Sequence, residues 1–188
     1  EGNEECALLE KGVGPWKRYL QGLGKWPSEW QCPGVNPVGY LKRLHSEKRI
    51  ILVHLCHLTE EEMTWIGDHR NLSPCVCLRS NLYVSNQAAS LDRLWQAGCK
   101  VALGTDSLAS NESLSLQAEM KTAKHLFPSL PSGEILRMAT LHGAQALGMD
   151  NELGSFEPVN RPGVLLAAAQ SLDEFLGAPQ QIPLRRVA

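Results

Sequence analysis

The 188-residue sequence lacks the features that mark several common classes of protein. Its 18 Lys and Arg residues are balanced by 20 Asp and Glu residues, so it has no broad basic surface for nucleic acid or anionic lipid. Its longest apolar runs, IILV and GVLLAAA, are far too short to span a membrane, and no signal segment opens the sequence. We therefore expect a cytoplasmic protein whose partner is a small molecule, with no nucleic acid and no membrane among its partners.

The sequence also contains no C-x-x-C pair of the kind that zinc and redox motifs use. Several of its cysteines lie in apolar runs, where a thiol behaves as a small hydrophobic group. In a cytoplasmic protein such thiols stay reduced. We predict reduced core residues at the six positions, which are Cys6, Cys32, Cys56, Cys75, Cys77 and Cys99.

Nucleotide-binding motifs are absent, because no G-x-G-x-x-G turn follows an expected strand and no G-x-x-x-x-G-K-[ST] occurs. What the sequence does contain is an alternation of strand and helix patterns over residues 49–147. RIILVHL, SPCVCL and CKVALGTD predict strands; TEEEMTWIGDH and SLDRLWQAG predict helices between them, and SLQAEMKTAKHLF and SGEILRMATLHGAQALG predict two more. This order indicates a parallel sheet with right-handed crossovers, which fits a doubly wound sheet or part of an eight-stranded barrel.

The first part of the chain has a different character. Residues 4–11 predict a helix that ends at Gly12, and Asn36 followed by Pro37 predicts the start of another helix. The segment between these helices is rich in Gly, Pro and Trp. Tryptophans carry large apolar areas that disordered segments lack, so we expect an ordered loop region there.

Polar side chains follow each predicted strand. His54 ends the first strand, residues 79–81 (Arg, Ser, Asn) follow the second, and Asp106 and Ser107 follow the third. Taken singly, Asp106 could simply cap the next turn, and His54 could be a core histidine bonded to a backbone carbonyl. Taken together, they would point from the carboxyl ends of parallel strands into one mouth, where a metal ion or a water molecule could bridge them.

Four segments together resemble the C-terminal part of the amidohydrolase superfamily, in the branch of cytosine, guanine and adenosyl-homocysteine deaminases and triazine chlorohydrolases. The segments are VHLCHLTEEEM, SPCVCLRSNLYV, AGCKVALGTDSLASNESLSLQAEMKTA and ILRMATLHGAQALGMDNELGSFEPVNRPG. The resemblance implies an α/β fold that is the C-terminal part, about strands 6–8 with flanking helices, of a (β/α)8 TIM-type barrel. Residues 1–165 would form this partial metal-dependent hydrolase barrel, and residues 166–188 a weakly matched C-terminal tail.

The resemblance also implies a role for five residues. Asp106 would end strand 8, ligate a divalent metal and take the proton of the attacking water. His54 would end strand 6, binding the attacking hydroxide or the substrate in mononuclear enzymes and ligating the second metal in binuclear ones. Glu1 would shuttle a proton onto the substrate ring, and Asn81 and Ser110 would bind substrate. Zinc is the expected metal, with iron as the alternative.

The pattern of the family is incomplete here. The H-x-H pair of strand 1 and the histidine of strand 5 have no counterpart in the sequence. We therefore expect a fragment of a hydrolase that deaminates or dechlorinates a nitrogen heterocycle such as a purine, a pyrimidine, an adenosyl nucleoside or a triazine. Open strand edges would favour a homo-oligomer. The alternative is a degenerate, non-catalytic half-barrel that acts as an interaction module.

Overall fold

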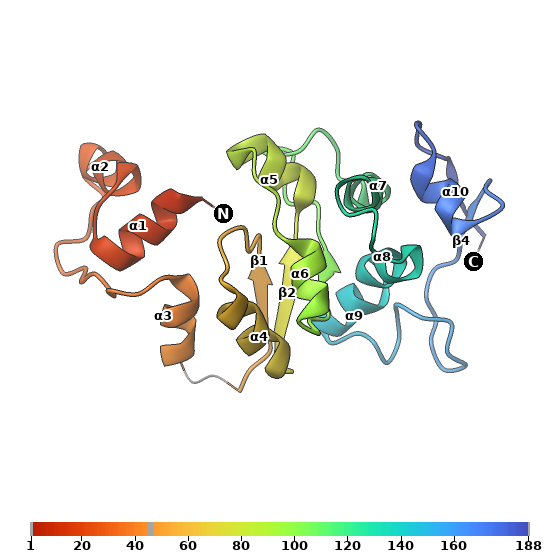
Figure 1. The fold of residues 1–188 in the computed structure, drawn as a ribbon, viewed down its shortest axis with the longest axis horizontal. Coiled ribbons are helices and arrows are strands. Elements are labelled where there is room, and N and C mark those ends of the chain that lie inside the picture. The colour runs from red at the N-terminus through yellow and green to blue at the C-terminus, as the bar shows by residue number, and fades with distance from the viewer. Residues whose placement is uncertain (1, 45–46, 188) are drawn as a thin grey trace. The chain divides into compact units, whose positions relative to one another are not determined.

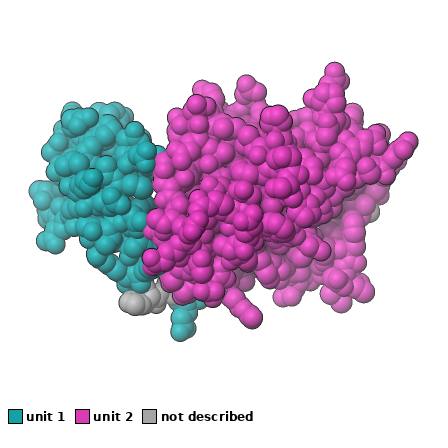
Figure 2. Space-filling model, in the orientation of Figure 1, with its two compact units in different colours: residues 1–48 teal, residues 49–188 magenta. Residues whose placement is uncertain are grey.

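The computed structural model describes residues 2–44 and 47–187. Contacts between Cα atoms divide the chain into two compact units, residues 1–48 and residues 49–188, which Figure 2 shows in different colours. Glu1, the residue expected to shuttle a proton, lies outside the described residues.

Unit 1, residues 1–48, contains three short helices, α1 (Asn3–Lys11), α2 (Pro15–Gly22) and α3 (Pro37–Arg43). α1 ends as predicted at Gly12, whose φ of 66° is in the left-handed region. α3 begins as predicted after Asn36, whose side chain accepts a 2.8 Å hydrogen bond from the Gly39 N–H. α2 corrects the expectation of a loop, because Pro15 at its first position supplies a helical φ without needing a hydrogen-bonded N–H.

Unit 2, residues 49–188, is built on a parallel sheet, as predicted. Its three strands lie in the order β1 (Ile50–Val53), β2 (Leu72–Val76) and β3 (Ala102–Leu103), with β2 in the centre. Helices connect the strands, as parallel pairing requires (Figure 1). These connecting helices are α4 (Glu60–Asp68) between β1 and β2, and α5 (Leu78–Ser85) and α6 (Leu91–Gln96) between β2 and β3.

Three further helices and a second, two-stranded sheet follow the parallel sheet. The helices are α7 (Leu116–Leu126), α8 (Ser132–Ala139) and α9 (Leu141–Leu147), and the antiparallel strands β4 (Leu165–Ala167) and β5 (Leu184–Arg186) flank α10 (Leu172–Gly177) in sequence. The segment between α10 and β5 is bonded to α7, where Lys121 Nζ donates to the Ala178 carbonyl at 2.8 Å and Gln117 Nε2 to the Ile182 carbonyl at 3.0 Å. Among the described residues, none of the helices has the length and apolar character needed to cross a membrane.

Unit 2 departs from the predicted elements at three places. The second strand stops at Val76, and the residues after Cys77 turn into α5 instead of continuing to Leu78. The single helix expected over 132–148 is broken into α8 and α9 at Thr140, whose backbone leaves the helical region with ψ of −87°. The third strand is shorter than its apolar run, because only Ala102 and Leu103 pair with β2.

The two faces of the sheet differ in burial. Residues at paired positions of neighbouring strands share a face, so Val53 and Cys75 are on one face and Leu52 and Pro74 on the other. The second face is the core of the unit, with Pro74 fully buried. On the first face Val53 remains 47% exposed, so an apolar part of the sheet is open to solvent.

Candidate active site

The candidate site lies where the three parallel strands end. His54 follows β1 and keeps one ladder hydrogen bond, from its N–H to the Cys75 carbonyl at 3.0 Å. Asp106 follows β3 after Gly104, whose N–H is bonded to the Val76 carbonyl at 2.9 Å. Parallel strands bring these carboxyl ends to one edge of the sheet, so both side chains belong to the same rim.

The backbone at this rim is in an unusual conformation. His54 and Leu55 have φ of 72° and 60°, and Asp106 has φ of 56°. Asp and His enter this left-handed region more readily than most residues, but each such residue still carries a conformational cost of about 1–3 kcal/mol. Strain of this kind is held in place by surrounding structure, and it collects at functional sites.

Two serine hydroxyls hold the carboxylate of Asp106. Ser80, from the first turn of α5, and Ser110, from the loop before α7, each donate to Asp106 Oδ2 at 2.7 Å. The two hydroxyl oxygens are also 2.9 Å apart. Because both serines bond the same oxygen, the other carboxylate oxygen is outside this pair of hydrogen bonds and can face a ligand.

The charge of Asp106 is stabilised by these neighbours. The hydrogen bond from the Ser110 hydroxyl, followed by that from Ser80, holds the pKa of the Asp106 carboxyl below its usual value; burial opposes this, and the nearby His54 imidazole adds a further lowering. Asp106 is therefore an ionised carboxylate throughout the neutral pH range. An ionised carboxylate can bind a cation or accept a proton.

Asn81 joins the histidine side of the site. This fully buried residue places its amide nitrogen 3.4 Å from His54 Nδ1 and 2.9 Å from the Cys56 sulfur. Its amide oxygen is buried without a hydrogen-bond partner among the described residues. An unsatisfied acceptor costs free energy in a folded protein, so this oxygen is a position where a bound molecule could donate a hydrogen bond.

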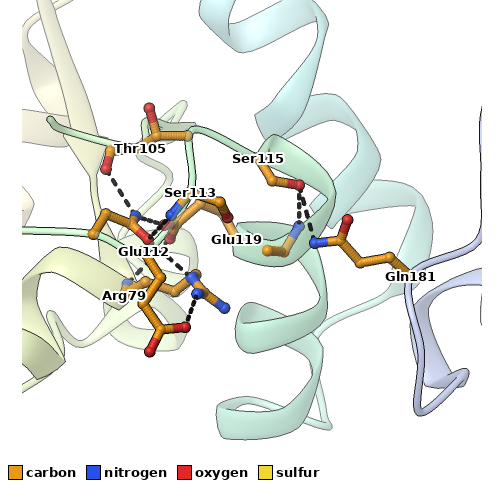
Figure 3. Close-up of polar contacts among 9 residues, drawn as sticks. Arg79, Thr105, Glu112, Ser113, Ser115, Glu119 and Gln181 are labelled. Carbon is orange, nitrogen blue, oxygen red and sulfur yellow. Dashed lines mark hydrogen bonds and ion pairs between the residues drawn. The ribbon is translucent and has the colours of Figure 1, made fainter. Parts of the chain in front are cut away.

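A buried carboxylate from α7 fixes the start of α5. Cys77, the N-cap residue of α5, offers no side-chain hydrogen bond to the helix. Glu119 takes over this role, because its Oε2 accepts from the Arg79 N–H at 3.2 Å (Figure 3). A negative charge at a helix N-terminus meets unpaired N–H groups and the positive end of the helix dipole. The orientation of Ser80 and Asn81 in the next positions of α5 therefore depends on α7.

Glu119 also holds the loop that carries Asp106. Its second oxygen accepts from Asn111 Nδ2 at 2.9 Å, and the same nitrogen donates to the Thr105 carbonyl at 2.9 Å. Arg79 Nε donates to Asn111 Oδ1 at 3.1 Å, which closes the network drawn in Figure 3. Burial raises the pKa of the Glu119 carboxyl, and the hydrogen bonds from Arg79 and Asn111 oppose that rise. This network connects both halves of the site.

The structure brings together four of the five residues expected at the site, namely His54, Asn81, Asp106 and Ser110. Two further residues of the site, Ser80 and Glu119, received no role from the sequence. Ser80 does lie among the polar residues 79–81 that follow the second predicted strand. Glu119 carried no such signal, because its role depends on contacts distant in sequence.

The described residues supply part of a metal site. A carboxylate and an imidazole are both suitable ligands for zinc, and Asp106 and His54 lie at the same rim. Within residues 2–44 and 47–187, however, no group of three or more His, Cys, Asp or Glu side chains could hold a metal ion. Catalytic zinc sites use three protein ligands, so the donors present fit such a site in kind and do not complete it in number.

Comparison with known proteins matches this geometry to a family of hydrolases. The model of the amidohydrolase family matches residues 3–162. A 5-methylthioadenosine/S-adenosylhomocysteine deaminase of Moorella thermoacetica is 32% identical over 141 residues, which cover 71% of this chain and 33% of the relative. The corresponding deaminase of Teredinibacter turnerae is 36% identical over 132 residues, covering 65% and 30%. The chain thus spans about a third of the length of the curated relatives that it matches.

Solved structures lead to the same family. A zinc-bound adenosine deaminase from Xanthomonas campestris has a TM-score of 0.70 and 29% identity, over 76% of this chain and 36% of that one. The aminofutalosine deaminase of Helicobacter pylori has a TM-score of 0.78 and 25% identity, over 98% and 49%. These neighbours imply a TIM-barrel-type α/β fold. Since the family match covers most of the sequence and the fold agrees, the chain belongs to the amidohydrolase family.

Proposed function

We propose that the protein containing this chain is a metal-dependent hydrolase that removes an amino group from a nitrogen heterocycle. The observation that carries the proposal is the convergence of His54, Asn81, Asp106 and Ser110 at the carboxyl rim of a parallel sheet. TIM-barrel enzymes keep their reactive groups at that rim. Family membership and the deaminases among the relatives favour this reaction class.

The three parallel strands would be about strands 6–8 of the barrel. This assignment is supported by a histidine at the end of β1 and an aspartate after β3, in the order that the family resemblance implies. It is also supported by the open face of the sheet at Val53, which would be the interior wall of a complete barrel. The chain would then contribute one side of the active-site mouth.

Asp106 and His54 would hold a divalent metal, with zinc expected and iron as the alternative. A zinc-bound relative supports the metal, and the ionised carboxylate supports the ligand. The metal would supply a Lewis acid that lowers the pKa of water toward neutrality. Because the chain spans about a third of its relatives, we propose that further ligands come from parts of the fold outside these residues.

Different residues of the chain would accept the proton and bind the substrate. Asp106 would accept the proton of the attacking water, and the hydroxyls of Ser80 and Ser110 would keep its carboxylate in one orientation. The unpartnered oxygen of Asn81 would accept a hydrogen bond from substrate. The role of Glu1 in protonating the ring stays a prediction.

The substrate would be an aminated heterocycle of the purine type. The relatives named as deaminases of 5-methylthioadenosine, S-adenosylhomocysteine and adenosine support this class over a pyrimidine or a triazine. Triazine hydrolases are also among the structural neighbours, with a TM-score of 0.61 for one bound to zinc, so the panel of test substrates must include chlorinated triazines.

The proposal is tested by measuring ammonia release and metal content after dialysis. Both measurements are made on the 188-residue chain and on the longest native polypeptide that contains it, with aminated purines, adenosyl nucleosides, pyrimidines and triazines. In the active form, Asp106→Asn should reduce kcat by about 10²-fold or more, because the amide cannot take the proton of water. The matched control is Asp68→Asn, at an exposed position at the end of α4, which should leave kcat unchanged.

A specific observation also favours the non-catalytic alternative, because the described residues lack a group of three metal ligands. The same assay decides between the two functions. Stoichiometric metal and turnover in the longer polypeptide support the hydrolase. Absence of both in every form of the protein would contradict it and leave an interaction module built on a degenerate barrel.

A further inference from the structure

One face of α7 is bonded to a segment near the C-terminus. This segment, residues 178–182, directly follows α10 and is called the brace segment below. Its backbone carbonyls accept hydrogen bonds from two side chains of α7. Lys121 Nζ donates to the Ala178 carbonyl at 2.8 Å, and Gln117 Nε2 donates to the Ile182 carbonyl at 3.0 Å. The two ends of the brace segment are therefore both attached to the same helix.

These contacts are of the stronger kind. Lys121 is a charged donor that also bonds the Gln180 carbonyl, and hydrogen bonds from ionised donors are about twice as strong as neutral ones. Gln117 is a buried residue, so its amide would be left without a partner if the brace segment moved away. Figure 3 shows a further contact, in which Gln181 Nε2 donates to Ser115 Oγ at the N-cap of α7, at 3.4 Å.

Glu119 lies on the opposite face of α7. Gln117 and Lys121 are four residues apart, which places them above one another on one face of the helix. Glu119 is two residues from each of them, which corresponds to about 200° around the helix axis. α7 therefore lies between two sets of polar contacts, with the brace segment on one side and Arg79 and Asn111 of the candidate site on the other.

Apolar packing restrains α7 only weakly along its axis. The buried apolar residues of this helix are Ala118, Met120 and Ala123. Ridges of large side chains fix the position of one helix on another, whereas alanine is small and methionine is flexible. The directional hydrogen bonds on the two faces of α7 therefore have a large share in setting where the helix lies.

The contacts of Glu119 tolerate little displacement of α7. The bond from the Arg79 N–H to Glu119 Oε2 is 3.2 Å long, at the upper end of the range for N–H···O bonds. A further separation of about 0.5 Å would take the two atoms beyond hydrogen-bonding distance. The start of α5 would then lose the carboxylate that caps it, and Ser80 and Asn81 would lose their fixed position in the site.

We propose that Gln117 and Lys121 are positioning residues of the candidate site, which act through Glu119. Their bonds to the brace segment keep α7 in the place from which Glu119 holds the start of α5 and the loop that carries Asp106. The brace segment is then part of the framework of the site, although the family match ends before it, at residue 162. The inference concerns the geometry of the site and does not depend on the proposed deaminase activity.

The test is hydrogen exchange with mass spectrometry on the longest native polypeptide that contains the chain. Lys121→Met keeps an unbranched, helix-favouring side chain and removes the donor. We expect amide exchange in residues 78–85 and 105–112 to become about tenfold faster, because the lost charge-assisted bonds raise the population in which Glu119 is displaced. Exchange in β1 and α4 should stay unchanged. Lys121→Arg can donate to the same carbonyls and should restore slow exchange.

The matched control is Thr59→Ala, which removes a helix cap of unit 2 away from α7. It should speed exchange in α4 and leave residues 78–85 and 105–112 unchanged. Gln117→Met should reproduce the pattern of Lys121→Met, and it keeps the test decisive if that variant does not fold. The proposal is overturned if either range keeps its wild-type rate when the donors are removed, or if exchange rises equally throughout unit 2, which would be a general loss of stability.

Discussion

The two units of the molecule differ in how much apolar surface they bury. Among the described residues of unit 1, α1 and α2 bury no residue, and Val38 of α3 is the buried hydrophobic side chain, at 7% exposure. Unit 2 has a true core, in which Ile66, Leu78 and Leu94 are at most 1% exposed. Helices form in both units, but a hydrophobic core stabilises those of unit 2.

This difference shows that local sequence signals can form a helix without giving it the stability of a buried core. In unit 1, Asn36 caps α3 and Gly12 ends α1, and aromatic rings pack locally, with the rings of Trp26 and Trp30 4.9 Å apart and Lys17 over Trp26. Isolated helices shorter than about 12 residues are nevertheless marginal in water. We therefore expect unit 1 to open more readily than unit 2, and three experiments test this contrast.

The largest effect is expected from the core of unit 2. Ile66→Ala should lower the free energy of unfolding by about 2–5 kcal/mol, because it removes buried methyl groups and leaves a cavity beneath α4. Val38→Ala is the matched change in unit 1 and should cost less, without shifting the main transition. Urea unfolding gives the free energies, and hydrogen exchange with mass spectrometry assigns them to residues 2–44 or 49–187.

Equal losses of unfolding free energy in Ile66→Ala and Val38→Ala would contradict the proposed difference in stability between the two units. So would amide protection in α1 and α2 that matches the protection of β2. Either result would mean that unit 1 has an energetic share in the core of unit 2.

A change of intermediate size is expected at Glu119. Glu119→Gln keeps the shape but replaces one acceptor by a donor opposite Arg79 or Asn111, which should cost about 1–3 kcal/mol. Glu112→Gln is the control, because this exposed carboxylate makes a 3.3 Å ion pair with Arg79 that should contribute about 1 kcal/mol or less. The effect should appear in unit 2 alone.

The pH dependence of this variant follows from the raised pKa of Glu119. As pH rises through the ordinary pKa of a glutamate side chain, the unfolded carboxyl loses its proton before the folded one, so wild-type stability falls between that pKa and the raised pKa of the folded state. Glutamine has no proton to lose. The difference in stability between wild type and Glu119→Gln should therefore shrink as pH rises through this window, and a difference that grows would contradict a raised pKa for Glu119.

The smallest loss of stability is expected from removing a helix cap, and each unit has a cap that can be tested. Thr59 of unit 2 accepts from the Glu62 N–H at 3.2 Å, and Asn36 of unit 1 accepts from the Gly39 N–H at 2.8 Å. Thr59→Ala and Asn36→Ala should each weaken their own helix by about 1 kcal/mol. Thermal unfolding should register the loss at Thr59, whereas the loss at Asn36 should appear as faster exchange within α3. An equal shift of the melting temperature would count against separate stabilities.

Features set by neighbours in sequence were predicted well. The helix start at Asn36 and the end of α1 at Gly12 both depend on residues a few positions apart, and the structure confirms them. The strand and helix alternation over residues 49–147 also predicted the parallel sheet. The resemblance of motifs was sufficient to find the family.

Features set by distant residues were missed. α5 has no local cap, and its start is stabilised by Glu119 in α7, so the sequence around Leu78 resembled the continuation of a strand. The broken helix at Thr140 likewise shows no proline or glycine at the break.

The sequence by itself determined the α/β fold class, the end of α1, the start of α3 and the placement of His54 and Asp106 after parallel strands, because hydrophobic periodicity and capping act over a few residues. Only the tertiary structure decided which hydroxyls hold the Asp106 carboxylate and which carboxylate caps the start of α5. These contacts join residues that are far apart in the chain. Which residues form these contacts depends on how the strands and helices pack, and a local sequence pattern does not encode that packing.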